Sequence, residues 1–302
     1  MHVGSTQCLN FLDAKALIYG LNTFFQKGHI MMKFTGWLRV SLVAAVLAAS
    51  HVALAGTLFI GTDNEEFLTG GPSVMVKATV NGANFVSQIN IPMAFDLNGL
   101  GDGPGFLYAG TPNSTTLRTI DYNGNLISAV TGNFTSGCCN EEMQFSGGKL
   151  YHAHWSTNIQ EIDPLTGNVI ATFAQPEVVG MALVGGQLWI TNWGNRQVGT
   201  WDPISNVFNP VFTTPDLAGA LAYDPDSGIL WVGQAGGLVA PYSLAGSLLD
   251  VGFKPFGDIP GTIDGLTFLG EGTQPVPEPS SIALLALGLL GLGMVRRKHP
   301  LS

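Results

Sequence analysis

Gly148-Lys149-Leu150-Tyr151 and Gly186-Gln187-Leu188-Trp189 are two copies of a pattern in which a glycine is followed by a leucine and an aromatic residue. Further copies are Gly105-Phe106-Leu107-Tyr108 and Gly228-Ile229-Leu230-Trp231, and Thr57-Leu58-Phe59-Ile60 is a looser fifth. Successive leucines are separated by 49, 43, 38 and 42 residues. A structural unit of about 40 residues is therefore repeated along the chain.

Each repeat contains several short strands. The strand after the leucine–aromatic strand ends near an aspartate, in Ile120-Asp121, Ile162-Asp163 and Trp201-Asp202. The turns that follow, such as Tyr122-Asn123-Gly124-Asn125, suit hairpins with glycine or asparagine at positive φ. One strand follows each turn, and an apolar strand precedes each leucine–aromatic strand. Four strands per repeat are typical of a β-propeller blade, which buries its faces only by stacking on its neighbours.

The ends of the repeat region predict how the ring closes. Asp264-Gly265-Leu266-Thr267-Phe268 matches the first strand of a blade, and Leu58-Phe59-Ile60-Gly61 matches the second. Joined, they form one blade from both termini. The predicted fold class is an all-β propeller of about five four-stranded blades, at 42 residues per blade from Leu58 to Phe268. Over 57–268 the chain resembles propeller repeats of secreted bacterial proteins, without a Trp-Asp signature at a fixed position.

The C-terminal segment has three parts in a fixed order. Val276-Pro277-Glu278-Pro279-Ser280-Ser281 precedes an apolar run from Ile282 to Val295, and Arg296-Arg297-Lys298 follows it. Fourteen apolar residues span about 21 Å as a helix, which is short for a permanent anchor across about 30 Å of hydrocarbon. The basic cluster acts as a stop-transfer signal. A buried core helix is the alternative, but such a helix is not apolar all round with a basic end.

Val276–Lys298 resembles the PEP-CTERM sorting signal of Gram-negative, exopolysaccharide-producing bacteria. The resemblance implies recognition by an exosortase-like enzyme and cleavage near Pro277, Glu278 and Pro279. The precursor would be held transiently in the inner membrane by a transmembrane sorting helix and then delivered to the cell surface or extracellular matrix. The resemblance implies nothing about the domain in front.

The N-terminal segment predicts export. Lys33 and Arg39 precede an apolar stretch over 40–54, and Ala53-Leu54-Ala55 supplies a cleavage site with Gly56 as the first mature residue. A transmembrane anchor is the alternative. We therefore predict five segments along the chain. Residues 1–30 are a mis-assigned start or an extension, residues 31–55 are a signal peptide, and residues 56–270 form the propeller. Residues 271–279 are a Pro-rich linker, and residues 280–302 are the sorting helix with its basic tail.

The charge of the exported part excludes some partners. Between Gly56 and Pro279 there are five basic and twenty acidic residues, a net charge of −15. Such a surface repels nucleic acid and anionic lipid but tolerates calcium or a neutral glycan. No cofactor is predicted, and calcium is a candidate ligand of the oxygen-rich loops 63–66 and 224–228, which are otherwise solvated turns. With only Cys8, Cys138 and Cys139, the chain is not a disulfide scaffold; the adjacent pair forms either a vicinal disulfide or thiols.

Two tryptophans form a candidate ligand face. Trp155 and Trp193 each lie five residues after a repeat leucine, so we expect them in equivalent loops of neighbouring blades. Exposed indoles stack on sugar rings, and Asn158 and Asn195 nearby offer amide hydrogen bonds. The alternative is that each tryptophan packs between blades as part of the core.

The chain has one cluster of residue types that bind metals. His152 and His154 alternate on one strand and so share a face, and Glu141 and Glu142 follow Cys138-Cys139 at the entry to the same blade. Imidazole and thiolate suit zinc or copper, but no recognised ligand spacing is present. Serine-hydrolase, zinc-protease and phosphate-loop motifs are absent from the sequence.

These features favour a non-enzymatic, exported binding or adhesion module for exopolysaccharide or a surface protein. The alternative is a propeller enzyme, either a metal-dependent hydrolase or lyase, or a quinone-dependent oxidoreductase. An enzyme needs several carboxylates or histidines converging on the axis from the first strands. Those strands offer Glu142, Asp96 and Asp264 but otherwise mainly apolar residues.

Overall fold

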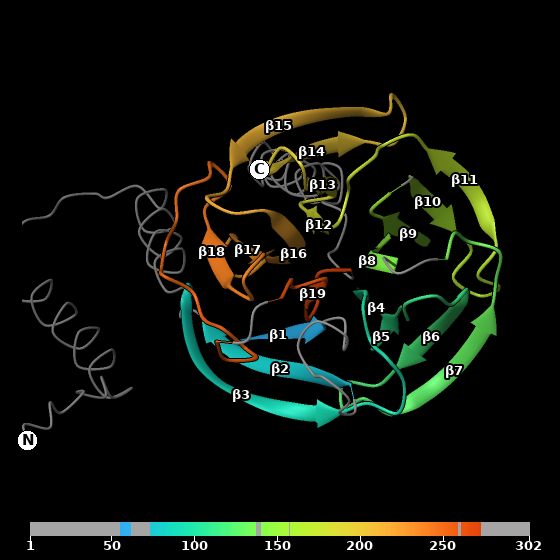
Figure 1. Ribbon diagram of the computed structural model, residues 1–302, viewed down its shortest axis with the longest axis horizontal. Coiled ribbons are helices and arrows are strands. Elements are labelled where there is room, and N and C mark those ends of the chain that lie inside the picture. The colour runs from blue at the N-terminus through green and yellow to red at the C-terminus, as the bar shows by residue number, and fades with distance from the viewer. Residues whose placement is uncertain (1–54, 62–72, 137–139, 157, 259–260, 273–302) are drawn as a thin grey trace, which may run out of the picture. The chain divides into compact units, whose positions relative to one another are not determined.

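The computed structural model describes residues 55–61, 73–136, 140–156, 158–258 and 261–272. Within these ranges the chain forms nineteen strands in five sheets that are arranged as blades around a common axis (Figure 1). No helix long and apolar enough to cross a membrane occurs in them. The prediction of an all-β, five-bladed propeller is confirmed.

Four blades have four antiparallel strands each. Their innermost strands are β19 (Gly265–Phe268), β4 (Leu100–Gly103), β8 (Asn140–Ser146) and β12 (Met181–Val184). Their second strands are β1 (Gly56–Gly61), β5 (Phe106–Ala109), β9 (Lys149–His154) and β13 (Gln187–Asn192). Their third strands are β2 (Val74–Asn81), β6 (Thr116–Ile120), β10 (Ile159–Ile162) and β14 (Gln197–Asp202). Their outermost strands are β3 (Asn84–Pro92), β7 (Leu126–Thr131), β11 (Val169–Phe173) and β15 (Val207–Thr213).

The fifth blade differs from the expected four strands. It contains only β16 (Ala218–Asp224), β17 (Ile229–Gln234) and β18 (Val239–Tyr242). The following chain returns along β18 through two isolated bridges, Val239 to Phe253 and Tyr242 to Leu248. Gly246 and Gly252 have φ of 84° and 76° there. A residue at positive φ interrupts an extended strand, so this segment cannot form a continuous fourth strand.

The repeated leucine and aromatic residue hold neighbouring blades together. Adjacent residues of a strand point to opposite faces, so the leucine contacts one neighbouring blade and the aromatic residue contacts the other. Each interblade cluster accordingly contains one of each, in the pairs Leu58 and Trp231, Leu107 and Phe59, Leu150 and Tyr108, Leu188 and Tyr151, and Leu230 and Trp189. The leucine–aromatic pattern therefore recurs once per blade because its two side chains pack at every blade interface.

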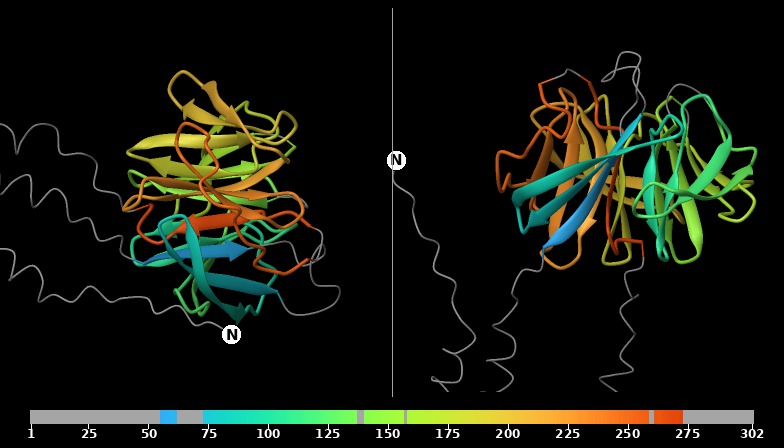
Figure 2. Two further views of the ribbon diagram at one scale, coloured as in Figure 1. Left: turned by 90° about the vertical axis from the view of Figure 1, so that its left-hand side faces the viewer. Right: turned by 90° about the horizontal axis from the view of Figure 1, so that it is seen from below.

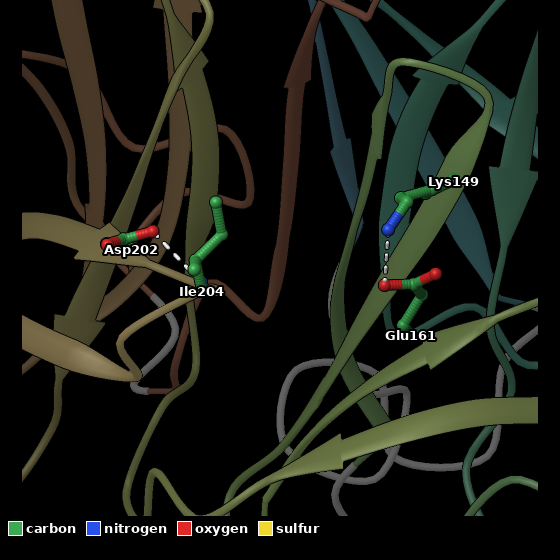
Figure 3. Close-up of polar contacts among 4 residues, drawn as sticks. All are labelled: Lys149, Glu161, Asp202 and Ile204. Atoms are coloured by element: carbon green, nitrogen blue, oxygen red, sulfur yellow. Dashed lines mark hydrogen bonds and ion pairs between the residues drawn. The ribbon is translucent and has the colours of Figure 1, made fainter.

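The aspartate after the third strand closes the outer hairpin of a blade. Asp202 accepts a hydrogen bond from the backbone N–H of Ile204 at 2.9 Å (Figure 3). Asp163 accepts one from Leu165 at 2.8 Å, and Asp121 accepts one from Asn123 at 2.8 Å. This is the Asx turn, in which a side-chain oxygen replaces a backbone acceptor. These aspartates therefore stabilise the turns at the outer hairpins.

Pairing of β1 with β19 closes the ring. The register places Leu58 opposite Phe268 and Gly61 opposite Gly265. The first and last described strands therefore share one blade, as the sequence predicts. Gly56 faces the ring of Phe268 so closely that any Cβ at this position would clash with it.

Three buried carboxyl groups hold the inner strands together around the axis. Glu142 on β8 accepts hydrogen bonds from the N–H of Leu221 on β16, at 2.8 Å, and of Leu266 on β19, at 2.6 Å. Glu271 accepts one from Leu183 on β12 at 2.8 Å. Asp102 on β4 accepts from the N–H groups of Gly270 and Gly272 in the segment that follows β19, at 2.9 and 3.3 Å.

Packing against the inner strands continues to the end of the described chain, because Glu271 is fully buried and its carboxyl group is bonded to those strands. Burial raises the pKa of Glu142 and of Glu271 well above the ordinary value, and it raises the pKa of Asp102 to about 7.

Removing β1 should open the ring. Deletion of 56–61 leaves β19 without its partner and exposes strand edges, so we expect a lower melting temperature and aggregation on size-exclusion chromatography. Deletion of 274–279 is the control of equal length, because it begins beyond the last described residue, Gly272. If both variants melt like the parent protein, closure through β1 does not hold the ring.

Stability should fall as pH rises through the range in which the axial carboxyl groups ionise. The native state keeps a proton on Asp102 up to about pH 7, whereas the ordinary pKa is 3.8, so the unfolded chain binds fewer protons between these values. We expect a higher melting temperature at about pH 5 than at about pH 8. For a domain of this size, a loss of about 1 kcal/mol in the free energy of unfolding lowers the melting temperature by about 2–4 °C.

Asp102→Asn is the matched variant for this pH dependence. The amide keeps one oxygen for the glycine N–H groups and offers its nitrogen to the Tyr122 hydroxyl, 3.5 Å from the native carboxyl. Its melting temperature should change less with pH than that of the parent. A melting temperature that rises between about pH 5 and about pH 8 contradicts the raised pKa values.

Candidate functional site

Trp155, Glu177 and Trp193 lie side by side on one face of the ring. Trp155 follows β9, Trp193 follows β13, and Glu177 belongs to the connection from β11 to β12. The N–H of Glu177 donates to the carbonyl of Trp155 at 2.9 Å, and the N–H of Trp193 donates to the carbonyl of Glu177 at 2.8 Å. We call this set the tryptophan face. The structure therefore brings together the two tryptophans from neighbouring blades.

The tryptophan face has an unusual backbone at its centre. Glu177 has a φ of 61°, a conformation that few residues other than glycine adopt and that its two backbone hydrogen bonds maintain. Its carboxylate lies over Gly194, where a Cβ would be 2.5 Å from Oε2. A glycine at position 194 thus leaves room for the carboxylate between the two tryptophan-bearing loops.

The side chains of the tryptophan face are accessible. Trp155 is 40% exposed and Trp193 is half-buried. Neither belongs to the interblade clusters, in which Trp189, Trp201 and Trp231 lie. The packing that the core alternative assigned to Trp155 and Trp193 is therefore made by other tryptophans.

The two predicted asparagines flank this face. Asn195 is exposed, and its N–H donates to Oδ1 of Asn192 at 3.0 Å, which shapes the loop that carries Trp193. Asn158 is half-buried, and its carbonyl accepts from the N–H of His154 at 3.3 Å.

Sequence reasoning missed Glu177. In a propeller, the connection between blades shares a face with the loop between the second and third strands. Position 177 lies in that connection, and Glu177 is the single charged residue between β11 and β12. A lone charged residue in this connection could have indicated a functional residue from the sequence. The positive φ of Glu177 and its proximity to Gly194 could not be predicted in that way.

The histidine pair is buried rather than open to solvent. His152 packs edge-on against Phe134, with ring centroids 5.0 Å apart, and neither ring nitrogen has a well-formed hydrogen bond within the described part of the chain. Burial lowers the pKa of His152 to about 3, with a smaller contribution from His154. His154 is also buried, and its Nδ1 lies 3.3 Å from the hydroxyl of Ser156.

The structure separates Glu142 from the other candidate metal ligands. Glu142 bonds to Leu221 and Leu266 at the axis, and a β-bulge between Asn140 and Met143 interrupts the register of β8 with β9. The side chain of Glu141 and the Cys138-Cys139 pair lie outside the described residues. Among those that are described, no three His, Cys, Asp or Glu side chains form a group suited to a metal ion.

One candidate calcium loop serves as a tight turn. Oδ1 of Asp224 accepts from the N–H groups of Asp226 and Ser227, at 3.0 and 3.2 Å, and its other oxygen bonds to the Ser227 hydroxyl. The second candidate, 63–66, lies outside the described residues. Calcium binding remains a prediction for both.

The axial carboxyl groups have a structural task. Glu142, Glu271 and Asp102 use their oxygens to accept backbone N–H groups from the inner strands and the segment after β19. Such bonds stabilise strands whose inner edges would otherwise be unpaired. Sequence reasoning named Glu142 but missed Glu271 and Asp102.

The chain leaves the domain on the side opposite the tryptophan face. Gly272 lies against Asp102 and Phe145, which precede the tight turns β4–β5 and β8–β9. Trp155 lies at the other end of β9, after the strand has crossed the blade. Figure 2 shows the blades edge-on, with strand ends and loops on two opposite faces.

Comparison with solved structures gives distant matches. Glutaminyl cyclase of Myxococcus xanthus is 15% identical, with a TM-score of 0.41 over 58% of this chain and 88% of that protein. The computationally designed Ika8 protein is 12% identical, with a TM-score of 0.37 over 60% and 59%. The designed Ika4 protein is 13% identical, with a TM-score of 0.36 over 50% and 92%. No curated protein matches the sequence.

A family model identifies the C-terminal segment. It describes the PEP-CTERM protein-sorting motif and matches residues 275–298, which include Pro277, Glu278, Pro279 and the basic residues Arg296, Arg297 and Lys298. These residues and Ala53 lie outside the described part of the structure, whereas Ala55 is exposed immediately before Gly56 at the start of β1. Signal-peptide cleavage there stays a prediction. The chain therefore carries a PEP-CTERM protein-sorting motif behind a five-bladed β-propeller.

Proposed function

We propose that the protein is a binding module that holds exopolysaccharide, or another surface glycan, through its tryptophan face. The PEP-CTERM motif indicates an exported, membrane-anchored precursor that an exosortase-like enzyme processes and that is sorted to the cell surface. The glycan-binding role is the part that goes beyond the motif.

The backbone-linked set of Trp155, Glu177 and Trp193 carries this proposal. Indole rings stack on the apolar faces of sugars, and nearby polar groups fix the orientation of the hydroxyl groups. Asn195 and the carboxylate of Glu177 supply such groups in the loops that carry the tryptophan face. A shallow face with these components suits an extended polymer better than a small enclosed substrate.

The position of Gly272, the last described residue, supports display of this face. Gly272, which leads towards the sorting motif, lies on the opposite side of the ring from Trp155 and Trp193. Attachment through the C-terminal segment would leave the tryptophan face directed away from the attachment point. Each stacked ring contributes about 1 kcal/mol beyond burial, so a single site is weak and many copies on one surface give strong binding.

Replacing both tryptophans should abolish glycan binding without unfolding the domain. Trp155→Ala with Trp193→Ala removes both stacking surfaces but leaves the interblade clusters intact. Binding of the purified exported protein to the producer's polysaccharide is measured by co-sedimentation, with the melting temperature as the test of folding. Ile204→Ala is the control, because this side chain is 96% exposed in the β14–β15 turn. A folded double variant that still binds places the site elsewhere.

Changing the sorting motif should block processing but not export. Replacing Pro277, Glu278 and Pro279 by alanine removes the residues that the exosortase-like enzyme is expected to recognise. We expect unprocessed protein to accumulate in the inner-membrane fraction while the surface fraction loses it. Fractionation and immunoblotting measure both. Normal surface delivery with unchanged processing would show that the motif is not used.

A further inference from the structure

Glu177 places a carboxylate against Gly194, in the loop that carries Trp193. Ion pairs in the described part of the chain join Lys149 to Glu161 and Lys254 to Asp258, and Glu177 takes part in neither. Arg196, three residues after Trp193, donates from Nη1 to the carbonyl of Pro215 at 2.9 Å, so its cationic guanidinium is held at the next connection and forms no ion pair with Glu177. The tryptophan face therefore combines aromatic rings with a carboxylate that has no ion-pair partner among the described residues.

The surrounding domain strengthens this negative character. Twenty acidic and five basic residues lie between Gly56 and Pro279, and acidic residues remain in large excess without the three buried axial carboxyl groups, so the domain's potential attracts cations and repels uronic acids or sulfated sugars. An indole face also attracts a cation, through the quadrupole of its ring. A charge-assisted hydrogen bond to a carboxylate is about twice as strong as a neutral one.

We infer that the tryptophan face selects glycans that carry free amino groups, such as polymers of deacetylated hexosamine. This inference rests on the proposed glycan-binding function and names the class of sugar. A protonated amino sugar offers an apolar ring face for Trp155 or Trp193 and, one bond from the ring, an ammonium group for Glu177. An acetylated hexosamine keeps the ring but lacks the charge.

The conformation of Glu177 leaves its carboxylate positioned for a ligand. Glu177 adopts its positive φ while its carboxylate occupies the space above Gly194, and no hydrogen bond to that carboxylate is present among the described residues. Asp216 and Asp202 accept backbone N–H groups in their own loops, whereas the carboxylates of Asp96 and Asp226, like that of Glu177, accept none among the described residues. Glu177 differs from Asp96 and Asp226 because hydrogen bonds hold its backbone between Trp155 and Trp193.

Paired oligosaccharides test the inference. Binding of the purified exported protein to a glucosamine tetramer and to an N-acetylglucosamine tetramer is measured by calorimetry at about pH 6, where the free amines are protonated. We expect the amino form to bind at least about ten-fold more tightly, and this preference to weaken as salt is added. Glu177→Gln should reduce the preference to about two-fold or less while binding of the acetylated form is unchanged.

Matched variants distinguish a failure of the amino-sugar inference from a failure of the proposed glycan-binding function. Asp226→Asn removes the same charge from an exposed turn on the opposite face and should leave the preference intact. An equal loss in Asp226→Asn and Glu177→Gln, or equal binding of both tetramers by the parent protein, overturns the amino-sugar inference. Binding of an oligolysine peptide as tightly as the glucosamine tetramer also overturns it, in favour of a general cation site. Unchanged binding of both tetramers after loss of the two tryptophans instead overturns the proposed function.

Discussion

The antiparallel pairing of β1 with β19 is the interaction on which the rest of the propeller depends. It joins residues separated by the whole length of the domain, with Leu58 opposite Phe268. Once it forms, Trp231 and Leu58 complete the last of five equivalent blade interfaces. Without it, two blade faces and two strand edges would be exposed to water or to other chains. The five blades are therefore stable only as a closed ring, because each blade depends on its neighbours.

Closure also brings the inner strands together around the axis. The N–H groups on the inner edges of these strands have no partner strand to bond to. Glu142 and Glu271 supply acceptors for several of these groups at once. A buried carboxyl group is costly when it is charged, and the raised pKa values express that cost. The acidic residues at the axis of this domain thus supply hydrogen-bond acceptors to inner-strand N–H groups that lack a partner strand.

The sequence predicted those features that depend on neighbouring residues. The leucine–aromatic pair, the Asp202-type turns and the closing strand all follow from local patterns that recur at each blade. The contacts of Asp102 with Gly270 could not be predicted, because the two residues are 168 positions apart. The same holds for Glu177, whose role depends on backbone bonds to loops of two different blades. The three-stranded fifth blade was missed because Gly246 and Gly252 interrupt a segment that otherwise reads as strand.

The number of strands that the C-terminal part of the domain gives to the closing blade determines at which face of the ring the described chain ends. Successive strands of a blade run in opposite directions, so each additional strand moves the chain end to the other side of the ring. Here the C-terminus supplies one strand, β19, which starts near the level of Gly61 and ends beside the start of β1. The chain therefore leaves on the side opposite Trp155 and Trp193. With two C-terminal strands it would leave on the same side, and the tryptophan face would be turned towards its own attachment point. Closure by a single strand thus links the topology of the ring to the accessibility of its candidate site.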